Sequence, residues 1–548
     1  MIDTAKTFAA LSEEFVEVYM RHQPVGATAA GLHDYDELLP DDSPDGVRAR
    51  TSWLRDLDQR LVASVPWEEL PLHQRVDYAL LRSRIASLRV DLEDLKVYAR
   101  NPARFPETAL RGVFLLAARP FAPLEERKEP ILARLMAIPD YLHEARASLG
   151  QVPEVLLDIA SEVNASGPAF VEEVVRTLLR SFPGEAERIE HAGGRARAGF
   201  LQYQEFLEGE LSRRVGGSFA IGERWMNYKL EREHMLSVGC AEVADLGRVQ
   251  VERTRTLLEQ EARRIDANRD WRAQIADARQ RHPEPLRLRE AYVAEVERAR
   301  RFTEEKHLAP LLDAPLEVIE TPLFERPTTP YATYLPPAPL DVDQTGYLFV
   351  TPIDIGRRRE DQAHQLEAHN YAALPLTVLH ESYPGHHLQL SHANHAGSRL
   401  RLLADSSMLS EGWALYCEEL MYEQGFFLDP ASRLFQLRDL LWRACRVVID
   451  VGLHTGRMSV PQAVEMLVEE AMLDPVAATI EVRRYTMTPT EPMSYVLGKL
   501  MLLELRDEAR RRQGRAFTLY DFHAALLRSG TLPLPLVREE LWQHLPVA

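Results

Sequence analysis

A histidine–glutamate pair at the end of an apolar run is the part of this sequence best suited to chemistry. Residues 374–394 read LPLTVLHESYPGHHLQLSHAN, so the run leads directly into His380 and Glu381, and His386 and His387 follow shortly after. In zinc hydrolases such a pair supplies one imidazole that binds the metal and one carboxylate that takes a proton from the attacking water. The pair therefore predicts a catalytic zinc site with Glu381 as the general base.

The spacing of these histidines requires the helix to break. Two zinc ligands on one helix are usually four residues apart, about 40° around the axis and one turn along it. His386 follows His380 at about 240° and about 9 Å of rise, and His387 at about 10.5 Å, so neither shares an ion with His380 on an unbroken helix. Pro384 cannot donate to the carbonyl of His380, and Gly385 permits a left-handed turn. We expect this step to return a histidine to the metal.

A third ligand is expected from the downstream segment SEGWALY, in which Glu411 follows Ser410. The intervening residues suffice for the rest of one helix, a turn and the start of an antiparallel helix. Two histidines and one glutamate leave a fourth position open, as a catalytic zinc requires. Glu411 could instead be a carboxylate that complements the helix dipole behind Ser410. The predicted ligands are His380, His386 and Glu411, with His387 as the alternative to His386.

The motifs HESYPGHH, SEGWALY and RRYTMTPTEPMSYVLGKLML, with PVGATAAGLHDYD and IGERWMNYKLERE nearer the N-terminus, resemble the bacterial DUF885 family over nearly the whole chain. This resemblance implies a gluzincin-like metallopeptidase that hydrolyses peptide bonds. Carried over by position, His380, His386 and Glu411 match the expected metal ligands and Glu381 the catalytic carboxylate. The family pattern HExxPGH favours His386 over His387. The resemblance implies peptidase chemistry and leaves the substrate open.

Four downstream residues could act on a peptide substrate. Tyr485 and Tyr495 keep their protons at neutral pH and could donate to a developing oxyanion. Arg484 and Lys499 could hold a terminal carboxylate. Tyr495 and Lys499 share a helix face, which is also typical of an ordinary surface with an extended lysine. Arg484 could instead pair with Glu481.

Two other classes of function stay open. Glu231–His234 and Glu304–His307 have the Glu-x-x-His spacing of helical di-iron proteins, although both lie in highly charged runs where the spacing arises by chance. The second alternative is an inactive metal-binding or peptide-binding protein on a peptidase scaffold. The presence of Glu381 argues against it, because a pure binding protein does not need a base at that position.

These residues must be positioned by helices, because most of the chain has helical periodicity. The pattern predicts a mostly α fold, and the resemblance to the DUF885 family implies that this is a zincin-like metallopeptidase fold with a deep active-site cleft. One helical catalytic unit is expected over residues 1–548, for which a two-lobed form stays open. Helices are expected at about 4–21, 45–64, 72–97, 122–148, 153–182, 184–212, 240–267, 285–306, 361–383, 386–395, 407–425, 430–456, 459–472, 475–485, 491–513, 518–528 and 534–544.

The Pro-rich segment 315–352 interrupts the helices and carries β-favouring runs at 317–323 and 346–351. Its prolines limit it to short or edge strands, so we expect a small antiparallel β element beside the active site. In related helical peptidases a short edge strand pairs with the extended substrate. Here residues 346–351 or 331–334 could do so by β-addition.

The composition excludes several partners. Lys plus Arg number 65 and Asp plus Glu 83, and the resulting net charge of -18 disfavours binding to nucleic acid or to an anionic membrane. The predicted partner is a short peptide, with one zinc ion per chain, and the oligomeric state stays open.

The cysteines and the N-terminal residues indicate a reducing compartment. Cys240, Cys417 and Cys445 are too few and too far apart for a disulfide framework or a cysteine zinc site. The first residues have neither a basic start nor a long apolar run, and no stretch of about 20 apolar residues occurs. We therefore expect a cytoplasmic protein.

Overall fold

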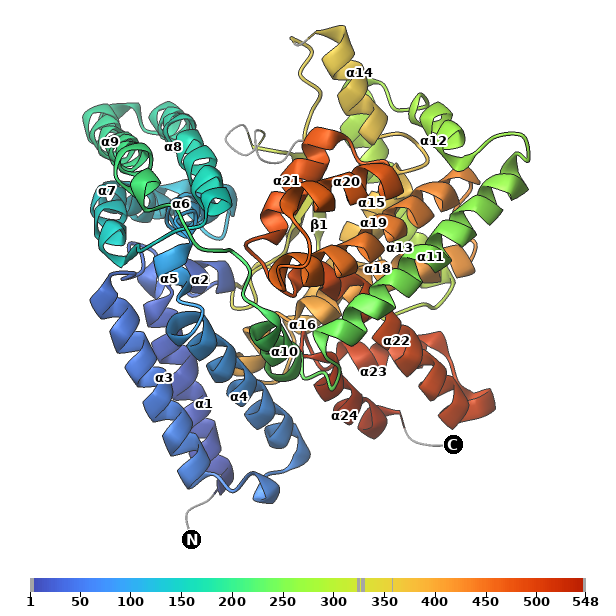
Figure 1. The fold of residues 1–548 in the computed structure, drawn as a ribbon, viewed down its shortest axis with the longest axis horizontal. Coiled ribbons are helices and arrows are strands. Elements are labelled where there is room, and N and C mark those ends of the chain that lie inside the picture. The colour runs from blue at the N-terminus through green and yellow to red at the C-terminus, as the bar shows by residue number, and fades with distance from the viewer. Residues whose placement is uncertain (1–3, 323–325, 327–330, 357, 546–548) are drawn as a thin grey trace. The chain divides into compact units, whose positions relative to one another are not determined.

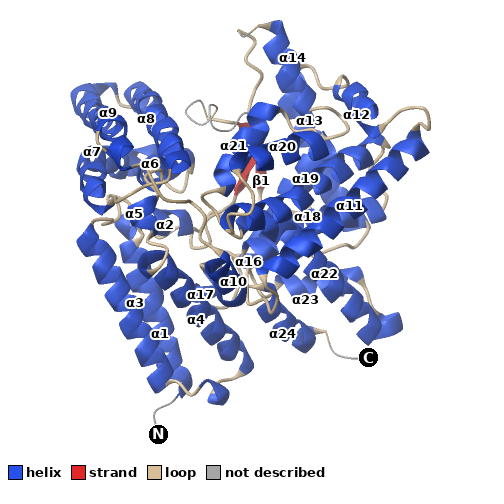
Figure 2. Ribbon diagram, in the orientation of Figure 1, coloured by secondary structure: helices blue, strands red, loops and turns tan. Residues whose placement is uncertain are grey.

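The structure is a computed structural model that describes residues 4–322, 326, 331–356 and 358–545. It divides into two compact units. The first spans Met1–Ile221, Pro322–Glu325 and Ala338–Asp343, and the second spans Gly222–Thr321, Arg326–Pro337 and Gln344–Ala548. Helices dominate both units, as predicted, and the described strands belong to one small sheet (Figures 1 and 2).

The first unit consists of helices that pack in two groups. One group contains α1, α3 and α4, and the other contains α6, α7, α8 and α9. Its helices are α1 (Thr4–His22), α2 (Pro24–Ala30), α3 (Pro44–Ser64), α4 (Leu72–Glu93), α5 (Val97–Arg100), α6 (Arg104–Ala118), α7 (Leu124–Ser148), α8 (Glu154–Ser181) and α9 (Ala186–Gly209).

Helix α6 is absent from the sequence prediction, which stops at residue 97 and resumes at 122. The helix forms because Phe105, Ala109, Val113 and Leu116 recur at helical spacing, and all four are fully buried. Pro106 lies in the first turn, where proline removes no internal hydrogen bond. Burial of this apolar face therefore stabilises a helix where none is predicted.

The second unit holds the predicted chemistry. Its longest helices pack in pairs, α11 against α19 and α18 against α22. Its helices are α10 (Glu223–Arg232), α11 (Cys240–Ile265), α12 (Trp271–Arg279), α13 (Leu288–Glu305), α14 (Arg359–Ala368), α15 (Leu374–Glu381), α16 (His386–Ala393), α17 (Arg399–Leu402), α18 (Ser407–Glu423), α19 (Ala431–His454), α20 (Val460–Ala471), α21 (Pro475–Tyr485), α22 (Glu491–Gln513), α23 (Leu519–Leu527) and α24 (Leu534–His544).

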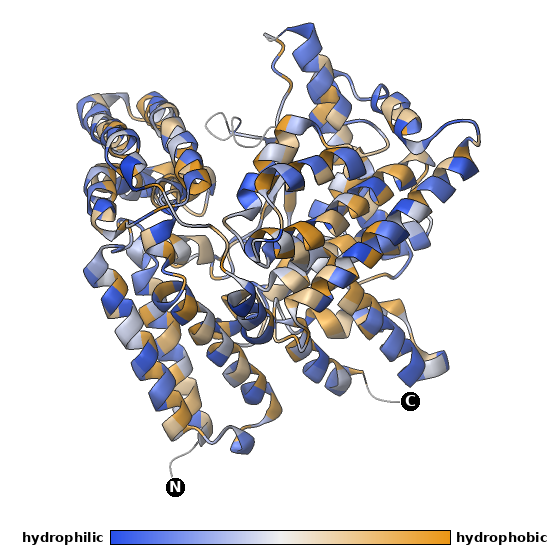
Figure 3. Cartoon of the chain, in the orientation of Figure 1, coloured by the Kyte–Doolittle hydropathy of each residue, from blue (hydrophilic) through white to orange (hydrophobic). Residues whose placement is uncertain are grey.

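The single helix predicted at 361–383 is split into α14 and α15. The Oδ1 atom of Asn370 accepts hydrogen bonds from the backbone N–H groups of Ala372 and Ala373, 3.1 and 2.9 Å away. Pro375 then occupies the first turn of α15, where its fixed φ suits a helix start. The helix that carries His380 is therefore short and almost wholly buried, whereas α14 is polar (Figure 3).

The β element is a mixed sheet of three strands, and the predicted all-antiparallel pairing is wrong. Strand β3 (Gly346–Val350) lies in the middle, parallel to β1 (Leu316–Glu320) and antiparallel to β2 (Ala332–Leu335). Every residue of β3 is buried, which explains its unbroken apolar run. Strand β2 is at an edge of the sheet.

Among the helices of the described ranges, from residue 4 to residue 545 with three short gaps, none is both long and apolar enough to cross a membrane.

Candidate metal centre

The predicted break between the two histidines is present. Helix α15 ends at Glu381 and α16 begins at His386, with a cis peptide bond between Tyr383 and Pro384. The indole Nε1 of Trp413 donates a hydrogen bond to the carbonyl of Pro384, 2.8 Å away. A buried side chain of α18 therefore provides a partner for a backbone group that the helix break leaves without one. The chain therefore changes direction between the histidines, as their spacing required.

Gly385 enables this break in a different way from the one predicted. Its φ is -74°, so the expected left-handed turn is wrong. A Cβ atom at this position would lie 2.0 Å from the carbonyl oxygen of His380 and 2.3 Å from that of Leu379. Glycine is needed because the chain folds back onto the end of its own helix.

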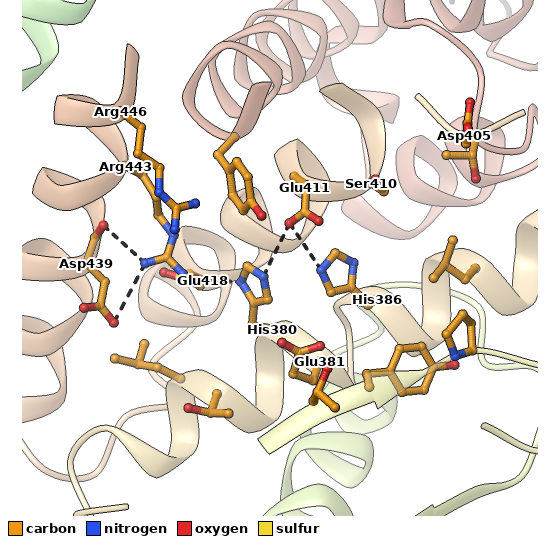
Figure 4. Close-up of a pocket in the computed structure, with 18 of the residues that line it drawn as sticks. His380, Glu381, His386, Asp405, Ser410, Glu411, Glu418, Asp439, Arg443 and Arg446 are labelled. Atoms are coloured by element: carbon orange, nitrogen blue, oxygen red, sulfur yellow. Dashed lines mark hydrogen bonds and ion pairs between the residues drawn. The ribbon is translucent and has the colours of Figure 1, made fainter. Parts of the chain in front are cut away.

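The break brings the three predicted ligands together. The Nε2 atoms of His380 and His386 lie 3.8 and 3.4 Å from Oε2 of Glu411 on α18. The potential ligand atoms of the three residues all lie within 4.8 Å of one another (Figure 4). Two ligands each about 2.1 Å from a tetrahedral zinc are about 3.4 Å apart, so small side-chain adjustments suffice to hold the ion.

His386 faces Glu411 through its Nε2 atom, and the other ring nitrogen makes no competing contact among the described residues. The Nδ1 atom of His386 is buried and has no hydrogen-bond partner in the described part of the chain. Its ring lies nearly perpendicular to that of His380, with ring centres 4.8 Å apart and an interplanar angle of 85°. Both rings present their Nε2 atoms to the carboxylate of Glu411. The donor set of two imidazoles and one carboxylate, with room for a fourth ligand, suits a catalytic zinc.

Glu418 completes the surroundings of His380, although it is not among the site residues predicted from the sequence. Its Oε1 atom accepts a hydrogen bond of 2.9 Å from Nδ1 of His380, which leaves Nε2 to face Glu411. A carboxylate in this position fixes the tautomer of a metal-binding histidine and raises its basicity. The available signal was the spacing, because Glu418 follows Glu411 by two helical turns and lies on the same face of α18.

The electrostatics of the cluster favour positive charge. Burial lowers the pKa of His380, but Glu411 and Glu418 outweigh burial and raise it to about 10. Burial raises the pKa of Glu411, but the two histidines hold it well below its usual range. Buried carboxylates that stabilise a proton so strongly also stabilise a metal cation in its place.

His387 does not point to the cluster, which contradicts its role as the alternative ligand. Its Nδ1 accepts a hydrogen bond of 2.8 Å from the hydroxyl of Tyr334, and its Nε2 donates one of 3.1 Å to the carbonyl of Ala314. Burial lowers its pKa to about 4, so the ring is neutral at pH 7. With both ring nitrogens engaged, His387 connects α16 to β2 through Tyr334 and to the segment before β1 through Ala314.

Glu381 and Tyr495 line the same pocket as the three ligands. Burial and the nearby Glu411 raise the pKa of Tyr495 to about 12, so its hydroxyl keeps its proton. Tyr495 belongs to α22, and this helix can approach α18 closely because Gly412 and Gly498 meet where the two helices pack. A Cβ on Gly412 would lie 2.6 Å from the Cα of Gly498.

The structure does not bring Tyr485 to the pocket. Its side chain is fully buried, and its hydroxyl accepts from Nε of Arg446 and donates to Oε2 of Glu481, both at 2.7 Å. The hydroxyl is therefore committed to a buried ionic network and cannot meet an oxyanion at the metal.

Arg484 and Lys499 do not line the pocket either, contrary to the prediction that they hold a substrate carboxylate there. Arg484 pairs with Glu481 over 3.1 Å, which is the alternative that the sequence left open. The ammonium of Lys499 is buried and lies 3.2 Å from Oε2 of Glu419. Because an ammonium is costly to bury without a carboxylate, Lys499 stays with its internal partner.

Cations reach the pocket from α19 instead. The cavity has a volume of about 540 Å³ and is bounded by β2, α15, α16, α18, α19, α22 and neighbouring loops. Arg443 and Arg446 belong to its wall, and nothing distinguishes them in an arginine-rich helix before the helices are packed. The lining residues are Thr333, Tyr334, Pro336, Leu376, Thr377, His380, Glu381, His386, Leu390, Ala404, Asp405, Ser410, Glu411, Glu418, Asp439, Arg443, Arg446, Tyr495 and Thr531.

The residues of the di-iron alternative do not form a site. Within the described residues, the only close group of three or more His, Cys, Asp or Glu ligand atoms is that of His380, His386 and Glu411. The Nε2 atom of His234 lies 2.9 Å from the hydroxyl of Thr490 and is buried in the protein.

Two solved structures have the same fold. One is described as a "putative lipoprotein of unknown function" from Shewanella oneidensis, with a TM-score of 0.80 and 23% identity, over 97% of this chain and 99% of that chain. The other is a "putative lipoprotein" from Colwellia psychrerythraea, with a TM-score of 0.85 and 18% identity, over 100% of both chains. At these identities the similarity shows the fold alone. The search of curated proteins gives no match.

The family model described as "Bacterial protein of unknown function (DUF885)" matches residues 24–541. This match covers nearly all of the chain, including the helix break, His380, His386, Glu411 and the whole pocket wall. The chain belongs to the DUF885 family.

Proposed function

We propose that this protein is a gluzincin-like zinc peptidase that hydrolyses peptide bonds in short peptides. The observation that carries the proposal is the convergence of His380, His386 and Glu411 within 4.8 Å, in a pocket that Glu381 also lines. A zinc ion held by these three residues supplies a Lewis acid that makes a water molecule nucleophilic near neutral pH.

Glu381 follows directly after His380 at the end of α15, so it enters the pocket beside the ligands (Figure 4). Its carboxylate takes a proton from the attacking water and then delivers it to the departing amine. Tyr495, which keeps its proton, donates a hydrogen bond to the oxyanion that develops on the carbonyl.

The edge strand β2 supplies a surface for an extended peptide. Thr333 and Tyr334 line the pocket, and the sheet order leaves β2 at the edge, whereas β3 is enclosed between two strands. Of the two stretches predicted for β-addition, residues 331–334 therefore fit and residues 346–351 do not. A cavity of about 540 Å³ accommodates a small ligand and excludes a folded protein.

The zinc-loaded protein is to be incubated with a mixed library of short peptides, and new termini are to be identified by mass spectrometry. The Glu381→Gln variant should keep its zinc and lose about 10²- to 10⁴-fold in rate, because only the base is removed. Glu360→Gln, on the exposed face of α14, is the matched control and should behave as the wild type. Identical spectra for wild type and Glu381→Gln would refute the proposal.

A further inference from the structure

The charges in the pocket are distributed unevenly about the metal cluster. Helix α19 carries Arg443 and Arg446 one turn apart, and both line the cavity. They lie on the opposite side of His380 and Glu411 from Asp405 (Figure 4). Both arginines therefore lie at one end of the pocket, where Asp439 also belongs to the wall, and Asp405 lies at the other end (Figure 4).

The charge of Arg446 is already compensated by the protein. Its Nη2 atom lies 3.1 Å from Oε2 of Glu481, and its Nε donates to the hydroxyl of Tyr485. Its guanidinium also lies over the rings of Trp442 and Tyr495, 4.3 and 4.8 Å from their centres. Arg446 forms part of the wall and fixes the neighbouring side chains.

Arg443 is compensated much less completely. The nearest carboxylate oxygen, Oδ2 of Asp439, is 4.0 Å from its Nη1, and Nη1 also donates weakly to the Asp439 carbonyl at 3.3 Å. Asp439 itself has a closer partner, because Oδ1 lies 2.8 Å from Nε of Arg438. The Nε atom of Arg443 is buried and has no hydrogen-bond partner within the described ranges.

A guanidinium that is only 14% exposed and incompletely paired is a place where an external carboxylate is bound strongly. Each short peptide carries one such group that is independent of its sequence, the C-terminal carboxylate. Because Arg443 shares the cavity with the three metal ligands, a peptide bound there presents a bond near its C-terminus to the hydrolytic centre.

We infer that Arg443 binds the C-terminal carboxylate of the substrate and that the protein is an exopeptidase acting at the C-terminal end. This inference rests on the proposed peptidase function. Hydrolysis breaks one C–N bond, the water oxygen and one of its protons stay on the new carboxylate end, and the other proton goes to the amine of the released fragment.

The kinetic test uses one random pentapeptide library in two forms, with free C-termini and with C-terminal amides. The wild type should cleave the free acids roughly 10- to 100-fold faster than the amides, the range expected for a buried charge-assisted pair. Arg443→Met should reduce this ratio to near one, and Arg443→Lys should leave an intermediate ratio, because lysine keeps the charge without the bidentate geometry. The ratio is independent of how much of a variant folds.

Arg457→Gln is the matched control, because Arg457 lies just beyond the end of α19 and its side chain is 61% exposed. It should keep the wild-type ratio. A ratio near one for the wild type, or an unchanged ratio for Arg443→Met, would overturn the assignment.

A binding measurement separates this inference from the peptidase proposal. Zinc-loaded Glu381→Gln protein should retain the free-acid library on ultrafiltration more than the amide library, and adding Arg443→Met should abolish the difference. Equal retention of both libraries would refute the carboxylate site even where peptides are hydrolysed. Absence of hydrolysis by the wild type, with selective retention of free acids, would refute the peptidase function and leave the site standing.

Discussion

Nδ1 of His380 donates a hydrogen bond of 2.9 Å to Oε1 of Glu418, and the two residues come from different helices. The same helix, α18, also carries Glu411, whose carboxylate faces Nε2 of His380 on the other side of the ring. One helix therefore supplies both a proposed metal ligand, Glu411, and the group that orients a second proposed ligand, His380. Any shift of α18 relative to α15 would disturb both contacts together.

Replacing Glu418 should weaken the metal site without removing a ligand. The variant Glu418→Gln is expected to lower zinc affinity about 10- to 100-fold, because Nδ1 of His380 loses a charged acceptor. Competition with a chromophoric chelator measures this affinity. The matched control is Glu423→Gln, five residues further along at the end of α18, where the carboxylate pairs with Arg506. Equal zinc affinities for the two variants would contradict the orienting role.

Replacing each of the two adjacent histidines by itself should affect the zinc content differently. His386→Ala is expected to lose stoichiometric zinc, because one of three protein ligands is removed. His387→Ala is expected to keep zinc and to lower the melting temperature, because it leaves the carbonyl of Ala314 without its donor. Elemental analysis of purified protein gives the zinc content. Zinc loss in His387→Ala alone would reverse the assignment of the ligand.

Removing the hydroxyl group of each pocket or network tyrosine distinguishes catalysis from structure. Tyr495→Phe should lower kcat about 10²- to 10³-fold with little change in KM, as expected for loss of one oxyanion donor. Tyr485→Phe should leave kcat nearly unchanged and destabilise the fold, because Arg446 and Glu481 lose a buried partner. Steady-state kinetics and melting curves on both variants provide the comparison. A larger loss of kcat in Tyr485→Phe would refute these roles.

Adding one methyl group at Gly385 should damage the metal site through the backbone. The Cβ of Gly385→Ala would overlap the carbonyl oxygen of His380 at 2.0 Å, so the helix break must open. We expect a destabilisation of about 2 kcal/mol or more, together with weaker zinc binding. Gly397→Ala, with no atom within 4 Å of its Cβ, should change neither quantity. Chemical denaturation and chelator competition measure the two effects, and unchanged zinc affinity in Gly385→Ala would show that the turn tolerates a side chain.

His33 in the first unit should make stability depend on pH. Burial lowers its pKa, but Asp341 and Asp36, at 2.9 and 2.7 Å, outweigh burial and raise it to about 9. Its stabilising charge is fully present below the unfolded pKa of about 6.5 and is lost as the pH rises through about 9. Arg134, 3.9 Å from Asp36, is the nearest competing cation.

His33→Gln should therefore be less stable than the wild type by about 1 kcal/mol at pH 6, a value discounted because solvent reaches the half-buried ring. The difference should shrink at pH 10. Urea denaturation at the two pH values measures it. A difference that grows between pH 6 and pH 10 would contradict the sign.

The helix break at the candidate site was predictable from the sequence. His380, Glu381 and the proline–glycine step are close in the chain, so their residue types and spacing predicted a metal ligand, a base and a break in the helix. The start of α20 was predictable for the same reason. Ser459 accepts from the backbone N–H of Gln462 in a capping box, and Pro461 lies in the first turn.

Tertiary structure decided which side chains remain available to a ligand. The sequence could not separate His386 from His387 by spacing alone, because the partners of His387 come from Tyr334 and Ala314, far away in the chain. Glu418 acquires its role only when α18 packs against α15. Lys499 is paired internally with Glu419, whereas Arg443 is left in the wall of the cavity. Residue type and spacing determine the local geometry of one segment. The partner of a charged side chain depends on long-range packing, which a local pattern does not specify.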